Sequence, residues 1–230
     1  MKLAMIGCGY VGLVSATCFA EFGHEVTCVD TDAARIEGLR AGRLPIFEPG
    51  LEALVAGNVA AGRLTFTTEL ATATAGAEAI FIAVGTPTRR GDGHADLRYV
   101  FAAVEAIAAA ATAPVVIVTK STVPVGTGRR IRALLAELRP ELAWSVASNP
   151  EFLREGAAIG DFMRPDRVVC GVEDEVAREV LHRVYRPLYL NETPVLFTGL
   201  ETAELIKYAA NSFLATKITF INEIADLCEQ

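Results

Sequence analysis

The sequence has few cysteines and no long cluster of basic residues. Its five cysteines form no C-x-x-C pair, and their odd number and irregular spacing indicate reduced thiols rather than disulfides or a zinc site. The formal net charge of −7, without a Lys/Arg cluster, argues against nucleic acid and anionic membranes as partners. We therefore expect no metal site and no polyanionic partner.

Long apolar runs are absent as well. The apolar stretches are interrupted by Gly, Pro or charge well before the roughly 20 residues that a membrane-spanning helix needs. The N-terminus starts with a predicted strand rather than with a signal peptide. Both absences predict a cytoplasmic protein without a membrane partner. With 230 residues, of which 52% are hydrophobic, the chain can form one large domain or one domain with an appendage.

The N-terminal residues point to a nucleotide-binding fold. The apolar run Leu3–Ile6 predicts a buried strand, and the residues after Gly12 predict a helix with a broad apolar face. Between them, Gly7, Gly9 and Gly12 match the G-x-G-x-x-G fingerprint of a dinucleotide site. The first glycine allows a tight turn, the second lets the backbone approach a diphosphate, and the third lets the helix pack on the strand. The helix's N-terminal amides would hold the phosphates.

An acidic residue follows at the position that such a site requires. A second predicted strand, Glu25–Val29, ends at Asp30, about 20 residues beyond the glycines, where a carboxylate binds the ribose 2′-hydroxyl of NAD. The alternative is that Asp30 only caps the next helix. Because a carboxylate repels a 2′-phosphate, we expect NAD rather than NADP. Arg35 complicates this preference, since a nearby arginine accommodates that phosphate.

Strands and helices alternate along the rest of the chain. This order predicts an α/β fold: a Rossmann-type, doubly wound parallel sheet followed by a long C-terminal helix. The further strands are expected at residues 64–68, 79–84, 114–118, 144–148, 168–172 and 195–197, and the further helices at 31–41, 51–59, around 100–107, 127–138 and 174–188. Residues 201–230 contain no Gly or Pro and have apolar residues at helical spacing. We therefore expect a nucleotide-binding domain at 1–198 and a long helix at 199–230.

Polar residues follow several of the predicted strands, at the edge where ligands bind in a doubly wound sheet. Thr86 and Thr122 each follow a buried strand, although an ordinary turn also explains Thr86. In the stretch 149–156, Glu151 and Glu155 are four residues apart and would share a helical face beside Arg154. The alternative is the start of a surface helix, where acidic residues are favoured anyway.

The predicted long helix carries a further polar pair. Lys207 and Asn211 are four residues apart and therefore on one face, beside an apolar surface. A partly buried lysine with an amide one turn away suits the stabilisation of an anion or alkoxide. The alternative is a lysine that only extends its ammonium group to solvent. His94 lies among glycines and is expected to be a loop residue rather than a catalytic base.

Five motifs together resemble the UDP-glucose 6-dehydrogenase family. They lie at residues 7–14, 85–87, 120–126, 149–156 and 207–211, so that the resemblance covers the chain from end to end. The Asn-Pro-Glu stretch at 149–151 is close to diagnostic for nucleotide-sugar 6-dehydrogenases. GDP-mannose dehydrogenase is the nearest related type, but Glu155-Gly156 and residues 161–167 look more like the UDP-glucose branch.

The resemblance implies an activity and a role for each site residue. The C6 alcohol of UDP-glucose would be oxidised to the carboxylate of UDP-glucuronate with two NAD and one water, through a cysteine thioester. Thr122 and Glu151 would hold the water and move protons, while Lys207 and Asn211 would stabilise negative charge on the C6 oxygen. The implied substrate site comprises Glu151, Phe152, Leu153, Arg154, Glu155, Lys207 and Asn211. The implied NAD site comprises Gly7, Gly9, Tyr10, Val11, Gly12, Asp30, Arg35, Thr86, Thr122 and Glu155, with Arg35 where the family usually has lysine.

One part of the family pattern is missing. The family's nucleophilic cysteine lies in a motif after the long helix, and this sequence stops before it. Cys228 sits at helical spacing within that helix, and the other cysteines are expected to be packing residues. We therefore expect these 230 residues to bind NAD without completing the reaction alone. The resemblance also implies a homodimer formed through the long helix.

Two other interpretations remain open. The first is another dehydrogenase of the same architecture, acting on GDP-mannose, on a different nucleotide sugar or on a 3-hydroxyacid. The second is a non-catalytic NAD-binding module that kept the fold and lost the chemistry.

Overall fold

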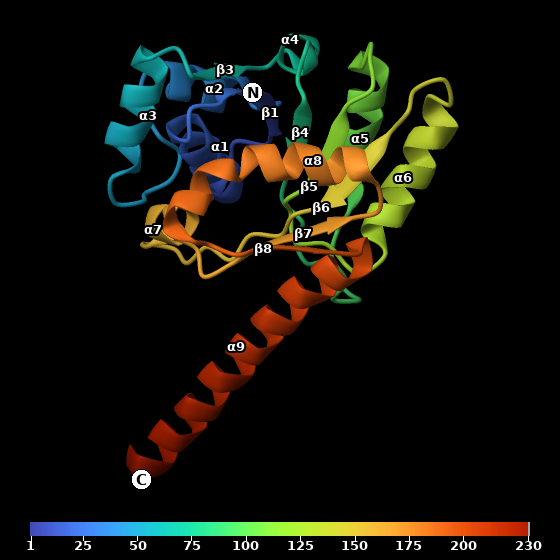
Figure 1. The fold of residues 1–230 in the computed structure, drawn as a ribbon. Coiled ribbons are helices and arrows are strands. Elements are labelled where there is room, and N and C mark those ends of the chain that lie inside the picture. Colours follow the sequence, from blue (N-terminus) through green and yellow to red (C-terminus); the bar gives the residue numbers. More distant parts are fainter. Residues whose placement is uncertain (230) are drawn as a thin grey trace.

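The computed structural model describes residues 1–229, which form an eight-stranded sheet with helices packed on both of its faces (Figure 1). The strand order is β3-β2-β1-β4-β5-β6-β7-β8. The strands are β1 Lys2–Ile6, β2 Glu25–Val29, β3 Leu64–Thr67, β4 Ala79–Ile82, β5 Val116–Thr119, β6 Ser145–Ser148, β7 Val168–Val172 and β8 Val195–Thr198. The order reverses direction between β1 and β4, which is the position where doubly wound sheets bind their ligands.

The helices fill the connections between these strands. They are α1 Tyr10–Glu21, α2 Ala33–Arg40, α3 Leu51–Ala60, α4 Leu70–Thr74, α5 Arg98–Ala110, α6 Thr127–Leu138, α7 Ala158–Met163, α8 Glu175–Val184 and α9 Leu200–Glu229, with a 3₁₀ helix at Arg186–Asn191. The short helices α4 and α7 are not anticipated from the sequence. The predicted helix at 174–188 ends early, at Val184, because Pro187 lacks the N–H group that would continue it.

Two hydrophobic cores lie on opposite faces of the sheet. Successive side chains of a strand point to opposite faces, so Leu3 and Met5 belong to one core and Ala4 and Ile6 to the other. The first core also takes buried residues from α1, α3, α7 and α8, and the second takes them from α4, α5 and α6. This three-layer arrangement confirms the predicted doubly wound α/β fold.

The sheet departs from an all-parallel arrangement at one pairing. All pairs among strands β1 to β6 are parallel, but β7 pairs with β6 antiparallel through Ala147↔Val172 and Ser148↔Gly171. Strand β8 runs parallel to β7. This register places the ends of β7 and β8 beside the carboxyl end of β6, and α9 starts there. The contact is close, since a Cβ atom at Gly171 would lie 2.7 Å from the Cβ of Ala203.

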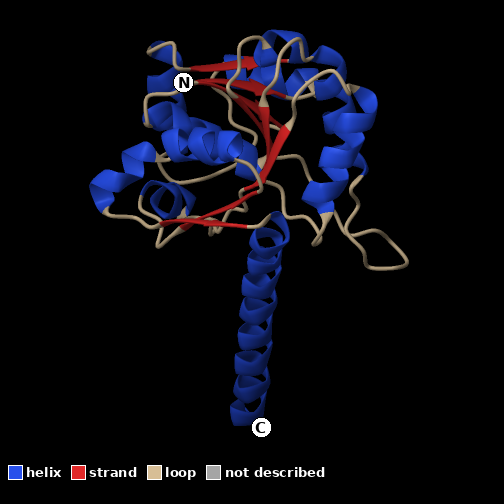
Figure 2. Ribbon diagram, turned by 45° about the vertical axis from the view of Figure 1, so that its right-hand side comes forward, coloured by secondary structure: helices blue, strands red, loops and turns tan. Residues whose placement is uncertain are grey.

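Helix α9 projects away from the rest of the molecule (Figures 1 and 2). Its buried residues are confined to its first turns, and they are Leu200, Ala203, Glu204 and Lys207. From Asn211 to Glu229 every residue is exposed. The last residue of the predicted helix, Gln230, lies outside the described residues. A search of the helices in the described part of the chain finds none with the length and apolarity to cross a membrane.

Candidate functional site

The glycine loop after β1 has the geometry that its fingerprint requires. Gly7 has φ +101°, and a Cβ atom there would lie 2.6 Å from the carbonyl oxygen of Ala83. A Cβ atom at Gly12 would lie 1.9 Å from the carbonyl oxygen of Gly7. No atom lies within 4 Å of the equivalent position at Gly9. Gly7 and Gly12 are thus required by close packing, while Gly9 faces open space into which a ligand can approach.

Helix α1 starts directly at this loop. Its N-cap residue Gly9 supplies no side-chain cap, and its first turn contains no acidic residue. The first backbone amides of a helix have no partner within the helix and carry a partial positive charge. The N-terminus of α1 can therefore bind an anionic group such as a diphosphate.

Asp30, immediately after β2, is tied to the same loop. Its Oδ2 atom accepts hydrogen bonds from the Cys8 amide at 2.8 Å and from Nη1 of Arg35 at 2.7 Å. Burial raises the pKa of Asp30, but hydrogen bonds from the Asp32 and Cys8 amides and from Arg35 outweigh it and leave the pKa below its usual value. The carboxylate is therefore ionised at neutral pH. The alternative interpretation, in which Asp30 only caps the next helix, is wrong, because Asp32 is the residue that caps α2.

A hollow of about 960 Å³ opens beside this loop at the carboxyl ends of the first four strands. This volume is within the range of small-molecule sites, about 300–1,000 Å³. Of the residues that the sequence assigns to NAD, the hollow is lined by Gly7, Gly9, Asp30, Arg35 and Thr86. Tyr10, Val11, Gly12, Thr122 and Glu155 are not among its lining residues. The hydroxyl of Thr86 donates to the carbonyl of Thr122 at 2.8 Å, which links the loops after β4 and β5.

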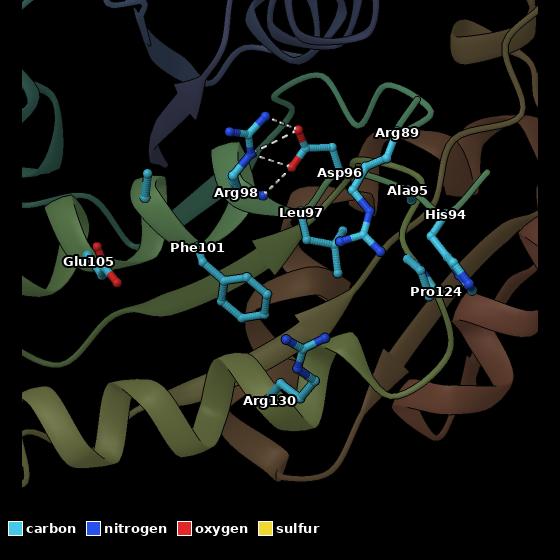
Figure 3. Close-up of a pocket in the computed structure, with 11 residues that line it drawn as sticks. Arg89, His94, Ala95, Asp96, Leu97, Arg98, Phe101, Glu105, Pro124 and Arg130 are labelled. Carbon is cyan, nitrogen blue, oxygen red and sulfur yellow. Dashed lines mark hydrogen bonds and ion pairs between the residues drawn. The ribbon is translucent and has the colours of Figure 1, made fainter. Parts of the chain in front are cut away.

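A second hollow, of about 610 Å³, lies between α5, α6 and the loop after β4 (Figure 3). Two of its arginines already have partners. Arg98 forms an ion pair with Asp96 at 2.6 Å, and the guanidinium of Arg130 lies 4.6 Å from the ring centroid of Phe101. His94 lines this hollow from an exposed loop, away from the glycine loop. The larger hollow is therefore the better candidate for a dinucleotide.

The stretch after β6 does not form the predicted helix. Residues 149–154 have no regular secondary structure, residues 155–157 form a turn, and α7 begins only at Ala158. Glu151 and Glu155 therefore share no helical face, and neither helical interpretation of this stretch is correct. The carboxylate of Glu151 accepts a hydrogen bond from the Leu153 amide at 2.6 Å, a local contact that competes with helical hydrogen bonding. Pro150, just before it, also disfavours helical backbone in Asn149.

Lys207 reaches this stretch from α9. Its Nζ atom lies 3.1 Å from Oε1 of Glu151, and the two side chains are only 7% and 11% exposed. The same ammonium lies 5.3 Å from the ring centroid of Phe152. The alternative of a lysine that extends to solvent is therefore wrong. Asn211, one turn further along α9, is exposed to solvent.

The remaining predicted substrate residues lie along the same stretch. Leu153 is partly buried against the core, whereas Arg154 and Glu155 are exposed. Arg154 is bound to the body of the protein through an ion pair with Asp161 at 2.6 Å. The stretch thus presents one buried carboxylate, an aromatic ring and an anchored arginine at the carboxyl edge of the sheet.

Lys120 is a buried cation that the sequence analysis does not single out. It follows β5, is 3% exposed, and donates to Oδ1 of Asn149 at 3.2 Å. Tyr185 Oη donates to the same Asn149 oxygen. Burial lowers the pKa of Lys120 to about 8. The sequence indicates only that a lysine follows an apolar strand. Its spacing does not predict that the ammonium group is buried against Asn149.

Glu204 fixes the start of α9. Its carboxylate is 2% exposed and accepts hydrogen bonds from the amides of Gly126 at 2.6 Å and Gly128 at 2.7 Å, at the N-terminus of α6. A carboxylate is stabilised at this end of a helix. Glu204 and Lys207 therefore dock the first turns of α9 against the loops that carry Thr122 and Glu151.

The cysteines are poorly placed for thiol chemistry. Four of them are buried in the first core, and Cys228 is exposed on α9; the four are Cys8, Cys18, Cys28 and Cys170. Burial raises the pKa of Cys18 and of Cys170 to about 12. These two thiols are therefore protonated and unreactive at neutral pH.

Comparison with known proteins gives consistent matches over the whole chain. A family model described as "UDP-glucose/GDP-mannose dehydrogenase family, NAD binding domain" matches residues 1–189, and the model of that family's central domain matches residues 201–230. The chain is 63% identical over 232 residues to the UDP-glucose 6-dehydrogenase of Rhizobium meliloti (strain 1021), covering 100% of this chain and 53% of that protein.

Two solved structures have the same fold. The GDP-mannose dehydrogenase of Pseudomonas aeruginosa, solved as a ternary complex, superposes with a TM-score of 0.91 at 37% identity, over 97% of this chain and 52% of its own. The UDP-glucose dehydrogenase of Pyrobaculum islandicum superposes with a TM-score of 0.90 at 47% identity, over 96% of this chain and 51% of its own. The chain spans about half the length of the curated relatives that it matches.

Proposed function

Because the chain belongs to the UDP-glucose/GDP-mannose dehydrogenase family and carries its NAD-binding domain, we propose that it is the cofactor-binding half of a UDP-glucose 6-dehydrogenase. The reaction is the NAD-dependent oxidation of UDP-glucose at C6 to UDP-glucuronate, in two hydride transfers. The main structural support is the buried ion pair between Lys207 and Glu151, which lies at the carboxyl edge of the sheet that also carries the glycine loop. The 63% identity to a UDP-glucose 6-dehydrogenase favours this substrate over GDP-mannose.

The proposed NAD site combines the glycine loop with the acidic residue after β2. NAD supplies the hydride acceptor when bound. The open space at Gly9 and the uncapped N-terminus of α1 suit its diphosphate. The ionised Asp30 suits the adenosine ribose, and its ion pair with Arg35 neutralises the arginine that would otherwise favour a 2′-phosphate. The other proposed contacts are Gly7, Tyr10, Val11, Gly12, Thr86, Thr122 and Glu155.

The chemistry at C6 is proposed for the loop after β6 and the first turns of α9. The ammonium of Lys207 is withdrawn from water, so it would stabilise negative charge on the C6 oxygen more strongly than an exposed lysine could. Glu151, its partner, would accept a proton and, with Thr122, hold the water molecule that the oxidation to the carboxylate consumes. Phe152, Leu153, Arg154 and Glu155 would contact the nucleotide sugar. Asn211 is exposed and would join the site only when a further part of the protein covers it.

The thiol chemistry is proposed to lie outside these residues. The Rossmann-half cysteines are buried in the core, and Cys228 lies on the projecting part of α9. We propose a division at residues 1–198 and 199–230, which the boundaries of the two family models support. The 230 residues alone would bind NAD but not oxidise UDP-glucose.

A partner for α9 is part of the same proposal. Phe213, Phe220, Ile224 and Leu227 are exposed and recur at helical spacing, so they share one face of the helix. The same face on a second copy would cover them in a homodimer. Four buried cysteines with free thiols also fit a reducing, cytoplasmic environment.

Titration calorimetry and turnover assays test the function. We expect the 230-residue chain to bind NAD and to produce no sustained NADH with UDP-glucose. The complete gene product is expected to produce two NADH per UDP-glucose and to act more slowly on GDP-mannose. Faster oxidation of GDP-mannose would support the related substrate instead. Absence of NAD binding would support a non-catalytic module and contradict the proposal.

A further inference from the structure

A buried carboxylate connects the two loops of the proposed site. Glu48 lies in the segment between α2 and α3 and is 5% exposed. Its Oε2 atom accepts hydrogen bonds from the hydroxyl of Tyr10 at 2.6 Å and from the amide of Gly156 at 2.8 Å. Its Oε1 atom accepts one from the amide of Ala158 at 2.8 Å. A single side chain thus binds residues that are far apart in the sequence.

The charge of Glu48 is held by hydrogen-bond donors, two of which are backbone amides. Burial raises the pKa of Glu48, but the bonds from Tyr10 and from the Gly156 and Ala158 amides outweigh it and leave the pKa below its usual value. Such charge-assisted hydrogen bonds are stronger than those between neutral groups. Ala158 is the first residue of α7, whose own N-cap residue provides no side-chain cap. Glu48 therefore caps this helix from another part of the chain.

The residues that Glu48 joins come from two segments, which are proposed to bind different ligands. Tyr10 is the first residue of α1, directly after Gly9 of the glycine loop. Gly156 and Ala158 end the stretch that carries Glu151 and Phe152. Tyr10 Oη also lies 3.5 Å from the carbonyl oxygen of Arg154. The contact therefore joins the segment proposed to hold the diphosphate of NAD to the segment proposed to hold the nucleotide sugar.

We propose that Glu48 is a positioning residue that couples occupancy of the glycine loop to the order of residues 151–157, and so to the binding of the nucleotide sugar. The identity of the two ligands rests on the function proposed above. When a diphosphate fixes the N-terminus of α1, it fixes Tyr10, and Glu48 transmits that restraint to the amides of Gly156 and Ala158. Each ligand then binds more tightly when the other is present, because both need the same arrangement.

Two substitutions separate the two sides of this link. Glu48→Gln replaces one acceptor oxygen with an NH₂ donor, so it must oppose at least one of the donors that Glu48 now satisfies. Tyr10→Phe removes only the hydroxyl that joins Glu48 to α1 and keeps both amide contacts. Glu52→Gln is the matched control, since it makes the same chemical change at an exposed residue in the first turn of α3.

The first readout is amide hydrogen exchange of residues 151–158 in the complete gene product, with and without NAD. In the unsubstituted protein, NAD is expected to slow exchange of these amides. In Glu48→Gln they exchange about tenfold faster, with or without NAD, which corresponds to the loss of one charge-assisted hydrogen bond. In Tyr10→Phe the slowing by NAD disappears. Slowing of equal size in Tyr10→Phe and in the control overturns the proposed coupling.

The second readout is steady-state kinetics with UDP-glucose as the varied substrate. Glu48→Gln is expected to raise KM for the nucleotide sugar about tenfold and to change kcat less than about threefold, because the reacting groups remain in place. A KM equal to that of Glu52→Gln overturns the role of Glu48. If Glu48→Gln does not fold, Tyr10→Phe still decides the matter through the exchange experiment. An unsubstituted protein that binds NAD but oxidises no nucleotide sugar contradicts the proposed function, whereas the exchange readout tests the coupling separately.

Discussion

The Nζ atom of Lys207 lies 3.1 Å from Oε1 of Glu151, and this ion pair joins the first turns of α9 to the loop after β6. Both side chains are largely buried, so neither charge is solvated well when its partner is absent. The pair therefore holds the helix against the sheet edge and, in the proposed function, also keeps a cation and a proton acceptor in contact. A change in either residue is therefore expected to affect stability as well as the proposed chemistry.

Removing the cation leaves a buried carboxylate without its partner. Lys207→Met is expected to lower the free energy of unfolding by about 3 kcal/mol, the usual cost of breaking a buried ion pair from one side. The double variant Lys207→Met/Glu151→Gln should recover part of this loss. Urea denaturation monitored by circular dichroism measures both. Lys217→Met, at an exposed position on α9, is the control and should change stability by less than about 0.5 kcal/mol.

Two glycines of the loop are expected to respond differently to substitution by alanine, because one is closely packed and the other faces open space. Gly12→Ala is expected to destabilise the fold by about 3 kcal/mol, because its Cβ would lie 1.9 Å from the Gly7 carbonyl oxygen. Gly9→Ala should leave stability nearly unchanged but weaken NAD binding about tenfold, since its methyl group occupies the space open to the diphosphate. Thermal unfolding and calorimetric titration separate the two effects. Unchanged NAD affinity in Gly9→Ala would contradict the proposed diphosphate site.

Cofactor choice should depend on Asp30. Asp30→Ala removes the proposed ribose contact and releases Arg35 from its ion pair. We expect NAD affinity to fall about tenfold or more, and NADP affinity to rise relative to NAD. Fluorescence titration with both cofactors measures the ratio. Asp32→Ala, which removes the cap of α2, should cost about 1 kcal/mol of stability and leave the ratio unchanged. An unaltered ratio in Asp30→Ala would count against the assignment.

Lys120 makes a prediction about pH. Burial lowers its pKa from 10.5 to about 8, so between these values the folded chain has released a proton that the unfolded chain keeps. Stability from this group therefore rises with pH across that window. The stability of the unsubstituted protein relative to Lys120→Met is expected to increase by about 2 kcal/mol from about pH 7 to about pH 9.5. Denaturant unfolding at both pH values measures the difference, and Lys217→Met should show no such trend.

Association through α9 should depend on one face of the helix. Phe220→Asp places a charge among the exposed apolar residues of that face and is expected to shift a dimer toward monomer. Thr219→Asp introduces the same charge at an exposed position that is rotated by about 100° from Phe220 around the helix axis. Sedimentation velocity of the complete gene product distinguishes the two. Equal behaviour of both variants would mean that this face is not the interface.

Much of the fold follows from local patterns. The strand at Lys2–Ile6, the turn at Gly7 and the helix from Tyr10 are specified by an apolar run, glycines at fixed spacing and a helical apolar face. Helix α6 begins and ends at the predicted residues, Thr127 and Leu138. The direction of β7 cannot be predicted from local patterns, because Val168–Val172 would be equally buried in a parallel or an antiparallel pair.

The candidate site is less accessible to sequence reasoning. The residues of the glycine loop and Asp30 directly follow the strands β1 and β2. Their spacing along the chain is therefore sufficient to predict where they lie. Lys120 and Glu48 act through contacts with residues that lie far away in sequence, namely Asn149 and Gly156. The helical prediction for residues 149–156 is wrong for a local reason, because the carboxylate of Glu151 accepts the hydrogen bond of the Leu153 amide and so competes with helical hydrogen bonding.

The antiparallel pairing of β7 has a mechanical consequence. Its register brings the ends of β7 and β8 beside the carboxyl end of β6, and α9 starts there with its buried residues confined to the first turns, up to Lys207. At 1.5 Å per residue, the arm from Lys207 to Glu229 is about 33 Å long, so a tilt of about 5° displaces its tip by about 3 Å. Contacts made with the far end of α9 would therefore restrain the orientation of the helix, and with it the position of Lys207 beside Glu151.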